Sequence, residues 1–123
     1  MAVTGPDFIA LQVRDLEKAA VFYEKVVGLT RAAFSPPHAV VFDTQPTFAV
    51  RDAAPGVDLE AGPLGLGVAL WLHDPEAVAL HAAVLAAGAT VVQEPFEGPF
   101  GTTFVFQDLD GYLVTIHDRA TRG

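Results

Sequence analysis

An internal repeat constrains this chain more than any other feature of its sequence. The segment VRDLE at residues 13–17 returns as LHDPE at residues 72–76, 59 positions later. Each segment is preceded by alternating apolar residues and followed by a helical apolar stripe that ends at a glycine, Gly28 or Gly88. Because a repeated supersecondary unit buries its apolar face against its copy, the sequence predicts two similar modules.

The first module begins with residues 8–14, where apolar and polar side chains alternate as in a half-buried strand. Asp15 is placed to cap the helix that follows, and Gly28 is placed to end it. Residues 38–42 and 47–51 are two short β segments. The first module is therefore expected to contain one helix and a small sheet.

The second module follows residues 52–66, which are rich in Gly and Pro and are interpreted as a linker or long loop. Residues 67–73 alternate like the first strand, and Asp74 with Pro75 is typical of a helix start. The expected helix ends at Gly88. The remaining predicted elements are strands at residues 90–92, 102–106 and 112–117, with a hairpin turn at 108–111.

The second module thus reads as a strand, a capped helix and three strands, which is a βαβββ unit, and the repeat assigns the same unit to the first module. One unit alone leaves a sheet face uncovered, so the predicted fold class is α+β, with two tandem βαβββ modules forming a curved mixed sheet around a cup. We expect the helices on the convex side. The predicted organisation is a single domain over residues 1–123, with module one at about 6–52, a linker at about 53–66 and module two at about 67–119.

Composition excludes several functional classes. The chain has no cysteine, which excludes a disulfide framework, a thiolate metal site and a cysteine nucleophile. Its net charge of −8 argues against a nucleic-acid partner and mildly favours a cationic or neutral ligand. No apolar run reaches the roughly 18 residues of a membrane span, and the first residues lack the features of a signal peptide. We therefore expect a cytoplasmic protein with no membrane partner.

Four short motifs carry a family resemblance. They are VRDLEK at residues 13–18, FYEKVVGL at 22–29, AAGA at 86–89 and FQDLDG at 106–111. In this order and spacing they resemble the vicinal oxygen chelate superfamily, which includes glyoxalase I, extradiol dioxygenases, fosfomycin-resistance enzymes and bleomycin-resistance proteins. The resemblance covers nearly the whole chain and supports the duplicated fold.

The resemblance also implies where a metal would be bound. Members with metal chemistry hold a divalent ion in the cup, with a His or Gln from the first strand and a Glu from the fourth strand of each module. Carried over to this sequence, these four positions fall on Phe8, on or near Ala49, on Gly67 and on Thr115. None supplies an imidazole or a carboxylate, so the sequence predicts a metal-free member without a cofactor.

Strand alternation predicts which side chains face the cup. Trp71, the single tryptophan, would stack on a planar or cationic ligand, although it could equally pack at a sheet edge or dimer seam. Residues 95–101, which include Phe96 and Phe100, are expected to form either a lid or a plain connection. The candidate ligand-binding residues are Phe8, Gln12, Trp71, His73, Phe100, Phe104, Thr115 and His117.

The sequence favours a protein that binds and sequesters a cationic or aromatic small molecule, as the metal-less bleomycin-resistance type does, with no catalytic residues. One alternative is a metal-dependent glyoxalase-like lyase, isomerase or dioxygenase that uses non-standard ligands such as His73 and His117. A third hypothesis is a non-catalytic dimerisation or regulatory module whose cup is filled by its own side chains. The resemblance implies a homodimer in each case.

Overall fold

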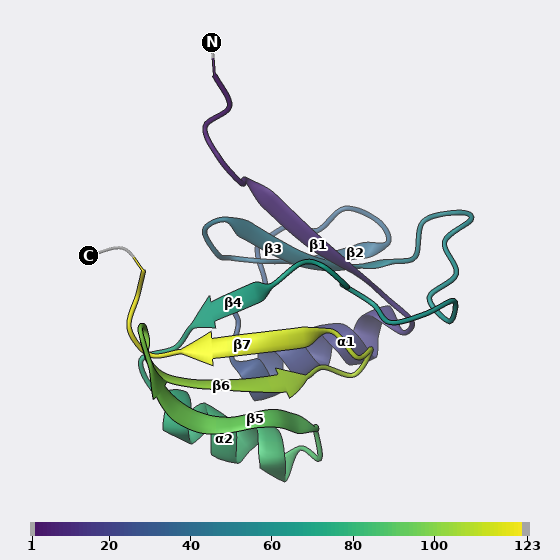
Figure 1. Ribbon diagram of the computed structural model, residues 1–123. Coiled ribbons are helices and arrows are strands. Elements are labelled where there is room, and N and C mark those ends of the chain that lie inside the picture. Colours follow the sequence, from purple (N-terminus) through teal and green to yellow (C-terminus); the bar gives the residue numbers. More distant parts are fainter. Residues whose placement is uncertain (1, 122–123) are drawn as a thin grey trace. The chain divides into compact units, whose positions relative to one another are not determined.

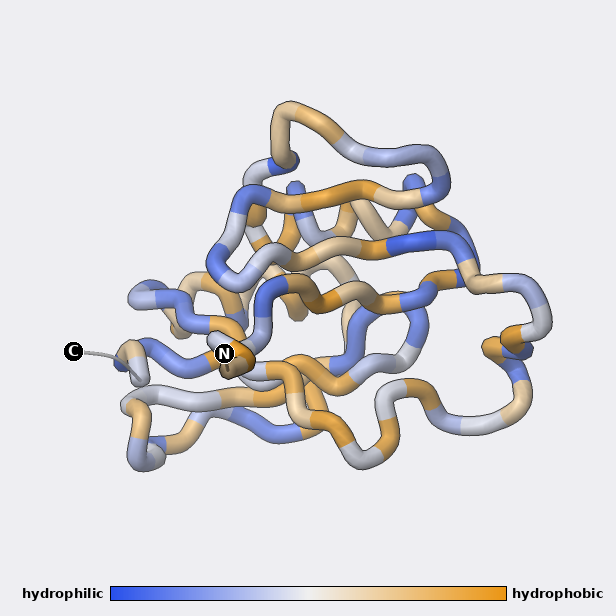
Figure 2. Tube along the Cα trace, turned by 90° about the horizontal axis from the view of Figure 1, so that it is seen from above, coloured by the Kyte–Doolittle hydropathy of each residue, from blue (hydrophilic) through white to orange (hydrophobic). Residues whose placement is uncertain are grey.

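The computed structural model describes residues 2–121. The chain divides into two compact units, residues 1–61 and 62–123, and each unit has its own sheet (Figure 1). Apolar residues recur along the strands of both sheets (Figure 2). The predicted α+β fold with two tandem modules is confirmed. Of the helices within residues 2–121, none has the length and hydropathy to span a bilayer.

The first unit contains a three-stranded sheet with the order β1-β3-β2. Strand β1 pairs parallel with β3, and β2 pairs antiparallel with β3. After the helix an isolated bridge joins Arg31 to Phe42, so the segment before β2 touches the sheet without forming a full strand. The elements are β1 (Phe8–Val13), α1 (Leu16–Val21), η1 (Phe22–Val27), β2 (Ala39–Phe42) and β3 (Thr47–Asp52).

The helix of the first unit begins and ends where its sequence predicts. The side chain of Asp15 accepts a hydrogen bond from the backbone N–H of Lys18, at 3.1 Å, which satisfies one of the free N–H groups of the first turn. From Phe22 the helix widens into a π-helical turn, η1, and it ends at Gly28 with φ +96°. This geometry buries Tyr23 against the sheet, with its ring centroid 5.2 Å from that of Phe48.

The second unit contains a four-stranded sheet with the order β4-β7-β6-β5. Strand β4 pairs parallel with β7, as β1 pairs with β3, and the other neighbours are antiparallel. Helix α2 packs against β5 and β6. The elements are β4 (Leu70–His73), α2 (Ala77–Ala86), β5 (Val91–Gly98), β6 (Gly101–Gln107) and β7 (Leu113–His117).

Three elements of the second unit differ from prediction. Strand β4 begins at Leu70, because Gly67 has φ +87° and Val68 N–H bonds the carbonyl of Gly65 in a turn. Pro75 lies before the helix, and Asp74 instead accepts a hydrogen bond from the N–H of Glu76 at 2.8 Å. The segment expected as a loop at residues 95–101 is mostly strand, because β5 continues to Gly98.

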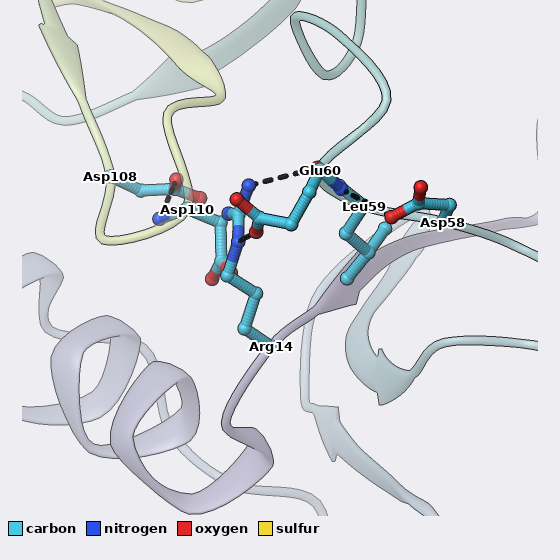
Figure 3. A network of polar contacts seen from close by, with 6 residues as sticks. All are labelled: Arg14, Asp58, Leu59, Glu60, Asp108 and Asp110. Carbon is cyan, nitrogen blue, oxygen red and sulfur yellow. Dashed lines mark hydrogen bonds and ion pairs between the residues drawn. The ribbon is translucent and has the colours of Figure 1, made fainter.

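The turn predicted at residues 108–111 is confirmed. Gly111 N–H donates to the carbonyl of Asp108 at 3.1 Å. The Asp108 carboxylate also accepts hydrogen bonds from the backbone N–H groups of Asp110 and Tyr112, and Figure 3 shows the bond to Asp110. These bonds fix the turn that connects β6 to β7. Asp108 contributes its carboxylate to them, and Asp110 contributes its backbone N–H.

Candidate functional site

The two faces of the second sheet have different surroundings. Cross-strand pairing places Trp71 beside Thr115, His73 beside His117, and His117 beside Thr103. Directly paired residues point to the same face of a sheet, so these side chains share one face. The residues that alternate with them on β7, Val114 and Ile116, are fully buried on the other face. Trp71, His73, Thr115 and His117 therefore lie on the face opposite Val114 and Ile116.

Four of these side chains form a group that we call the aromatic cluster: Trp71, His73, Phe100 and His117. The ring centroid of Trp71 is 6.1 Å from that of Phe100, with the planes at 84°, and 5.5 Å from that of His117. The His117 ring is also 6.0 Å from Phe100 and 5.7 Å from His73. These separations are those of edge-to-face and tilted aromatic pairs.

Exposure differs sharply within the aromatic cluster. Trp71 is 46% exposed and Phe100 is 37% exposed, whereas His117 is only 4% exposed. Large aromatic side chains are usually buried far more than this. The cluster thus presents two exposed aromatic rings with a buried imidazole beside both, which is suitable chemistry for a wall against a planar ligand.

Phe100 owes its position to a tight turn between β5 and β6. Gly98 pairs with Gly101, so only Pro99 and Phe100 connect the two strands. The Phe100 carbonyl accepts a hydrogen bond from Arg119 N–H at 3.0 Å, which ties the turn to the segment after β7. The turn is therefore fixed beside the end of β7.

A second tie involves Asp118. Its carboxylate accepts a hydrogen bond from Thr102 N–H at 2.9 Å, and its own N–H donates to the Thr102 carbonyl at 3.2 Å. This approach requires Gly101, which has φ +86°, because a Cβ at that position would lie 1.8 Å from the Asp118 carboxylate. The contact between Gly101 and Asp118 was not predicted from the sequence. A glycine within a strand pattern is the available signal, since it often marks a close approach of another part of the chain.

Both imidazoles of the cluster bond backbone carbonyls of the same segment. Nδ1 of His117 lies 2.8 Å from the Arg119 carbonyl oxygen, and Nε2 of His73 lies 3.2 Å from the Asp118 carbonyl oxygen. A carbonyl only accepts, so the ring nitrogen carries the proton in each bond. In the neutral rings this leaves Nε2 of His117 and Nδ1 of His73 as acceptors.

Two of the candidate residues, Phe8 and Gln12, belong to the first unit. Gln12 Oε1 accepts a hydrogen bond from the N–H of Ala54 at 2.7 Å. Arg14, the residue that follows β1, donates to the carbonyl of Leu59 at 2.9 Å and forms an ion pair with Glu60 (Figure 3). The segment expected as a linker is therefore fastened to β1 over residues 54–60. Phe8 is half-exposed at the start of β1.

Phe104 and Thr115 occupy opposite faces of the second sheet. Phe104 is fully buried, pairs with Ile116, and has its ring 5.2 Å from that of His81 on α2. It therefore belongs to the core under the helix and not to the aromatic cluster. Thr115 pairs with Trp71 and lies on the face of the cluster.

The positions where the family resemblance places metal ligands do not fit a divalent ion. Phe8, Ala49, Gly67 and Thr115 offer no imidazole or carboxylate. Strand register refines one of these positions. Trp71 pairs with Thr115, and Gln12, the equivalent of Trp71 in the repeat, pairs with Arg51. The residue of the first unit that matches Thr115 is therefore Arg51 and not Ala49. Within residues 2–121, no three His, Cys, Asp or Glu side chains gather closely enough to hold a metal ion.

Comparison with protein families gives one match. The model of the Glyoxalase/Bleomycin resistance protein/Dioxygenase superfamily matches residues 5–116. A comparison with curated proteins gives no match. The family match spans both units and all of the motifs that carry the resemblance in the sequence.

Solved structures share the fold over almost the whole chain. TnmS3, an antibiotic binding protein from Streptomyces sp. CB03234, is 23% identical, with 98% of this chain and 99% of that chain covered and a TM-score of 0.72. A glyoxalase-related enzyme from Fulvimarina pelagi is 20% identical, with 95% and 89% covered and a TM-score of 0.74. The hypothetical protein SA1046 from S. aureus is 27% identical, with 95% and 99% covered and a TM-score of 0.69.

Proposed function

Since the chain belongs to the Glyoxalase/Bleomycin resistance protein/Dioxygenase superfamily, we propose that it binds a planar aromatic or cationic small molecule at the aromatic cluster. Binding takes place without a metal ion and without chemical conversion of the ligand. The observation that carries this proposal is the edge-to-face pair of Trp71 and Phe100, both of which remain exposed.

The chemistry of the cluster supports such a ligand. Stacking on an exposed Trp ring removes apolar surface from water, and the ring face also attracts cations. The net charge of −8 raises the local concentration of a cationic ligand. TnmS3, which shares the fold, is described as an antibiotic binding protein, and this supports the same class of function here.

Metal independence is supported by the residues at the positions where the resemblance places ligands. None of these four positions can supply the imidazole and carboxylate donors of a catalytic ion. They are occupied by Phe8, Gly67 and Thr115, with either Ala49 or Arg51 as the fourth residue. We also propose that the protein acts in the cytosol, from the sequence pattern of its first residues, and that it is a homodimer, from the family resemblance. Light scattering after size exclusion measures the dimer.

A metal-dependent enzyme is the second candidate, and the adjacent rings of His73 and His117, 5.7 Å apart, favour it. In each ring one nitrogen already donates a hydrogen bond to a backbone carbonyl. The ion would therefore have to bind the other nitrogen of each ring. Metal analysis of protein purified without chelator distinguishes the two functions. Stoichiometric metal, or stabilisation by nickel, zinc or iron that EDTA reverses, would favour the enzyme.

Trp71 provides the first test of the proposed site. A panel of planar and cationic compounds headed by metal-free bleomycin is titrated into the protein by calorimetry. For each compound that binds, we expect Trp71→Ala to weaken affinity at least about tenfold, which corresponds to about 1.4 kcal/mol. Phe34→Ala is the matched control, because Phe34 is an exposed aromatic residue of the first unit. Unchanged affinity in Trp71→Ala would show that the ligand binds elsewhere.

A further inference from the structure

The buried imidazole of the aromatic cluster has one nitrogen with an assigned role and one without. Nδ1 of His117 donates to the Arg119 carbonyl at 2.8 Å. This bond fixes the proton on Nδ1 in the neutral ring, and Nε2 then carries a lone pair. Nε2 makes no hydrogen bond within residues 2–121.

The lone pair of Nε2 is not sealed inside the protein. Across the described residues, every fully buried side-chain nitrogen or oxygen has a hydrogen-bond partner. Because Nε2 has none, it must reach the surface, although His117 as a whole is only 4% exposed. The exposed rings of Trp71 and Phe100 are its neighbours, with centroids 5.5 and 6.0 Å from that of the imidazole.

We infer that Nε2 of His117 accepts a hydrogen bond from the ligand, so the ligand class is a planar aromatic compound with a hydroxyl or N–H donor at its edge. This inference rests on the proposed function and adds the polar contact that orients the ligand. The exposed rings of Trp71 and Phe100 contact the aromatic rings of the ligand, and Nε2 of His117 accepts the hydrogen bond from the donor at the ligand's edge. A ligand that presents only acceptors to Nε2 leaves this nitrogen desolvated and without a partner, which disfavours its binding.

The backbone makes this acceptor a fixed feature of the site. The Arg119 carbonyl belongs to the segment that also bonds the Phe100 turn, through Arg119 N–H at 3.0 Å. The same residue therefore orients the imidazole and positions an aromatic wall. A preorganised acceptor loses little conformational entropy when the ligand binds.

The first test needs no ligand. Nitrogen chemical shifts of ¹⁵N-labelled histidine distinguish the two neutral tautomers, and His117→Phe assigns the signals of His117. We expect the Nδ1–H tautomer at a pH where the ring is neutral. An Nε2–H tautomer would overturn the inference, whatever the protein binds, because Nε2 would then be a donor.

The second test uses two pairs of probes that differ only in the donor. The pairs are 2-naphthol with 2-methoxynaphthalene, and indole with 1-methylindole, each titrated while the Trp71 indole N–H signal is followed by NMR. We expect the donor of each pair to bind about threefold to tenfold more tightly, the range for one net hydrogen bond. His117→Phe should remove this difference. His81→Phe should retain it, because His81 lies on α2 and bonds Glu94.

The outcomes separate this inference from the proposed function. If both members of each pair bind equally and Trp71→Ala weakens both in calorimetric titrations, the aromatic site stands and the role of His117 is wrong. If His117→Phe keeps the preference for the donor, another group accepts the bond and the inference is also wrong. If no probe binds at millimolar concentration, both the inference and the proposed aromatic site are overturned.

Discussion

Gln12 on β1 and Arg14 directly after it occupy the same positions in the repeat as Trp71 and His73 on β4, 59 residues later. In the first unit these side chains bond the segment that follows β3, through Ala54 and Leu59. In the second unit the segment after β7 bonds the cluster through backbone carbonyls and leaves Trp71 open. Equivalent positions of the repeat therefore anchor a loop in one unit and present an exposed aromatic side chain in the other.

The difference shows how a duplicated module can specialise while the pairing of its first and last strands stays the same. Register is the same in both units, since Gln12 pairs with Arg51 as Trp71 pairs with Thr115. What differs is the polarity of the side chains and the bonding of the chain segment that follows the last strand. Polar groups that can bond a backbone hold that segment in place, whereas aromatic rings gain most by covering apolar surface.

The largest effect is expected from Gly101→Ala in the second unit. A Cβ there would meet the Asp118 carboxylate at 1.8 Å, in a backbone conformation with φ +86°. Gly56→Ala is the matched variant in the first unit, because Gly56 has φ +83° and no atom within 4 Å of its notional Cβ. We expect Gly101→Ala to lower the free energy of unfolding by about 3 kcal/mol and Gly56→Ala by about 1 kcal/mol.

Urea denaturation followed by circular dichroism measures this difference. Equal losses in the two variants would show that the contact between Gly101 and Asp118 adds nothing to the cost of a positive φ. The Trp71 fluorescence of Gly101→Ala should also change, since the clash displaces the turn that carries Phe100.

A smaller effect is expected from Arg14→Met in the first unit. This change removes the ion pair with Glu60 and the hydrogen bond to Leu59. Because the ion pair is exposed to solvent, we expect a loss of only about 1 kcal/mol. Limited proteolysis should nevertheless cut residues 53–61 faster. Arg51→Met is the control, since Arg51 Nε bonds only the neighbouring carbonyl of Asp52, and equal cleavage in both variants would mean that Arg14 does not hold the loop.

The smallest effect is expected at His38, which has φ +65° and is the only residue other than glycine with a positive φ within residues 2–121. Asn tolerates this conformation better than His. The exposed contact between His38 and Asp52 adds little stability. We expect His38→Asn to change the free energy of unfolding by less than about 0.5 kcal/mol, with a slight gain. A loss above about 1 kcal/mol in the same urea titration would show that the contact with Asp52 matters.

Local signals in the sequence predicted much of the fold. The Asp15 cap, the helix end at Gly28 and the turn at residues 108–111 are confirmed, because each depends on a few neighbouring residues. The family suggested by short motifs is confirmed over residues 5–116. Alternation also placed Trp71, His73, Thr115 and His117 on one face, because side chains on a strand have a period of two.

Features that depend on distant parts of the chain could not be predicted in this way. Phe104 was expected at the site, but the register of β6 against β7 places it opposite Ile116 in the core. Gln12 was expected to be available to a ligand, but a segment more than 40 residues later bonds its side chain. The role of Asp118 also depends on the turn at Gly101, which alternation does not reveal.

The carbonyl oxygens of residues 118 and 119 have a practical consequence for anyone who compares or engineers this protein. They orient the two imidazoles through the main chain, so the side chain of Arg119 is free to vary without altering their orientation. Variation at position 119 would then leave the orientation of His117 intact, whereas the side chain of Asp118 is held by its bond from Thr102 N–H. A proline at position 119, by contrast, would delete the N–H that bonds Phe100 and loosen the aromatic wall.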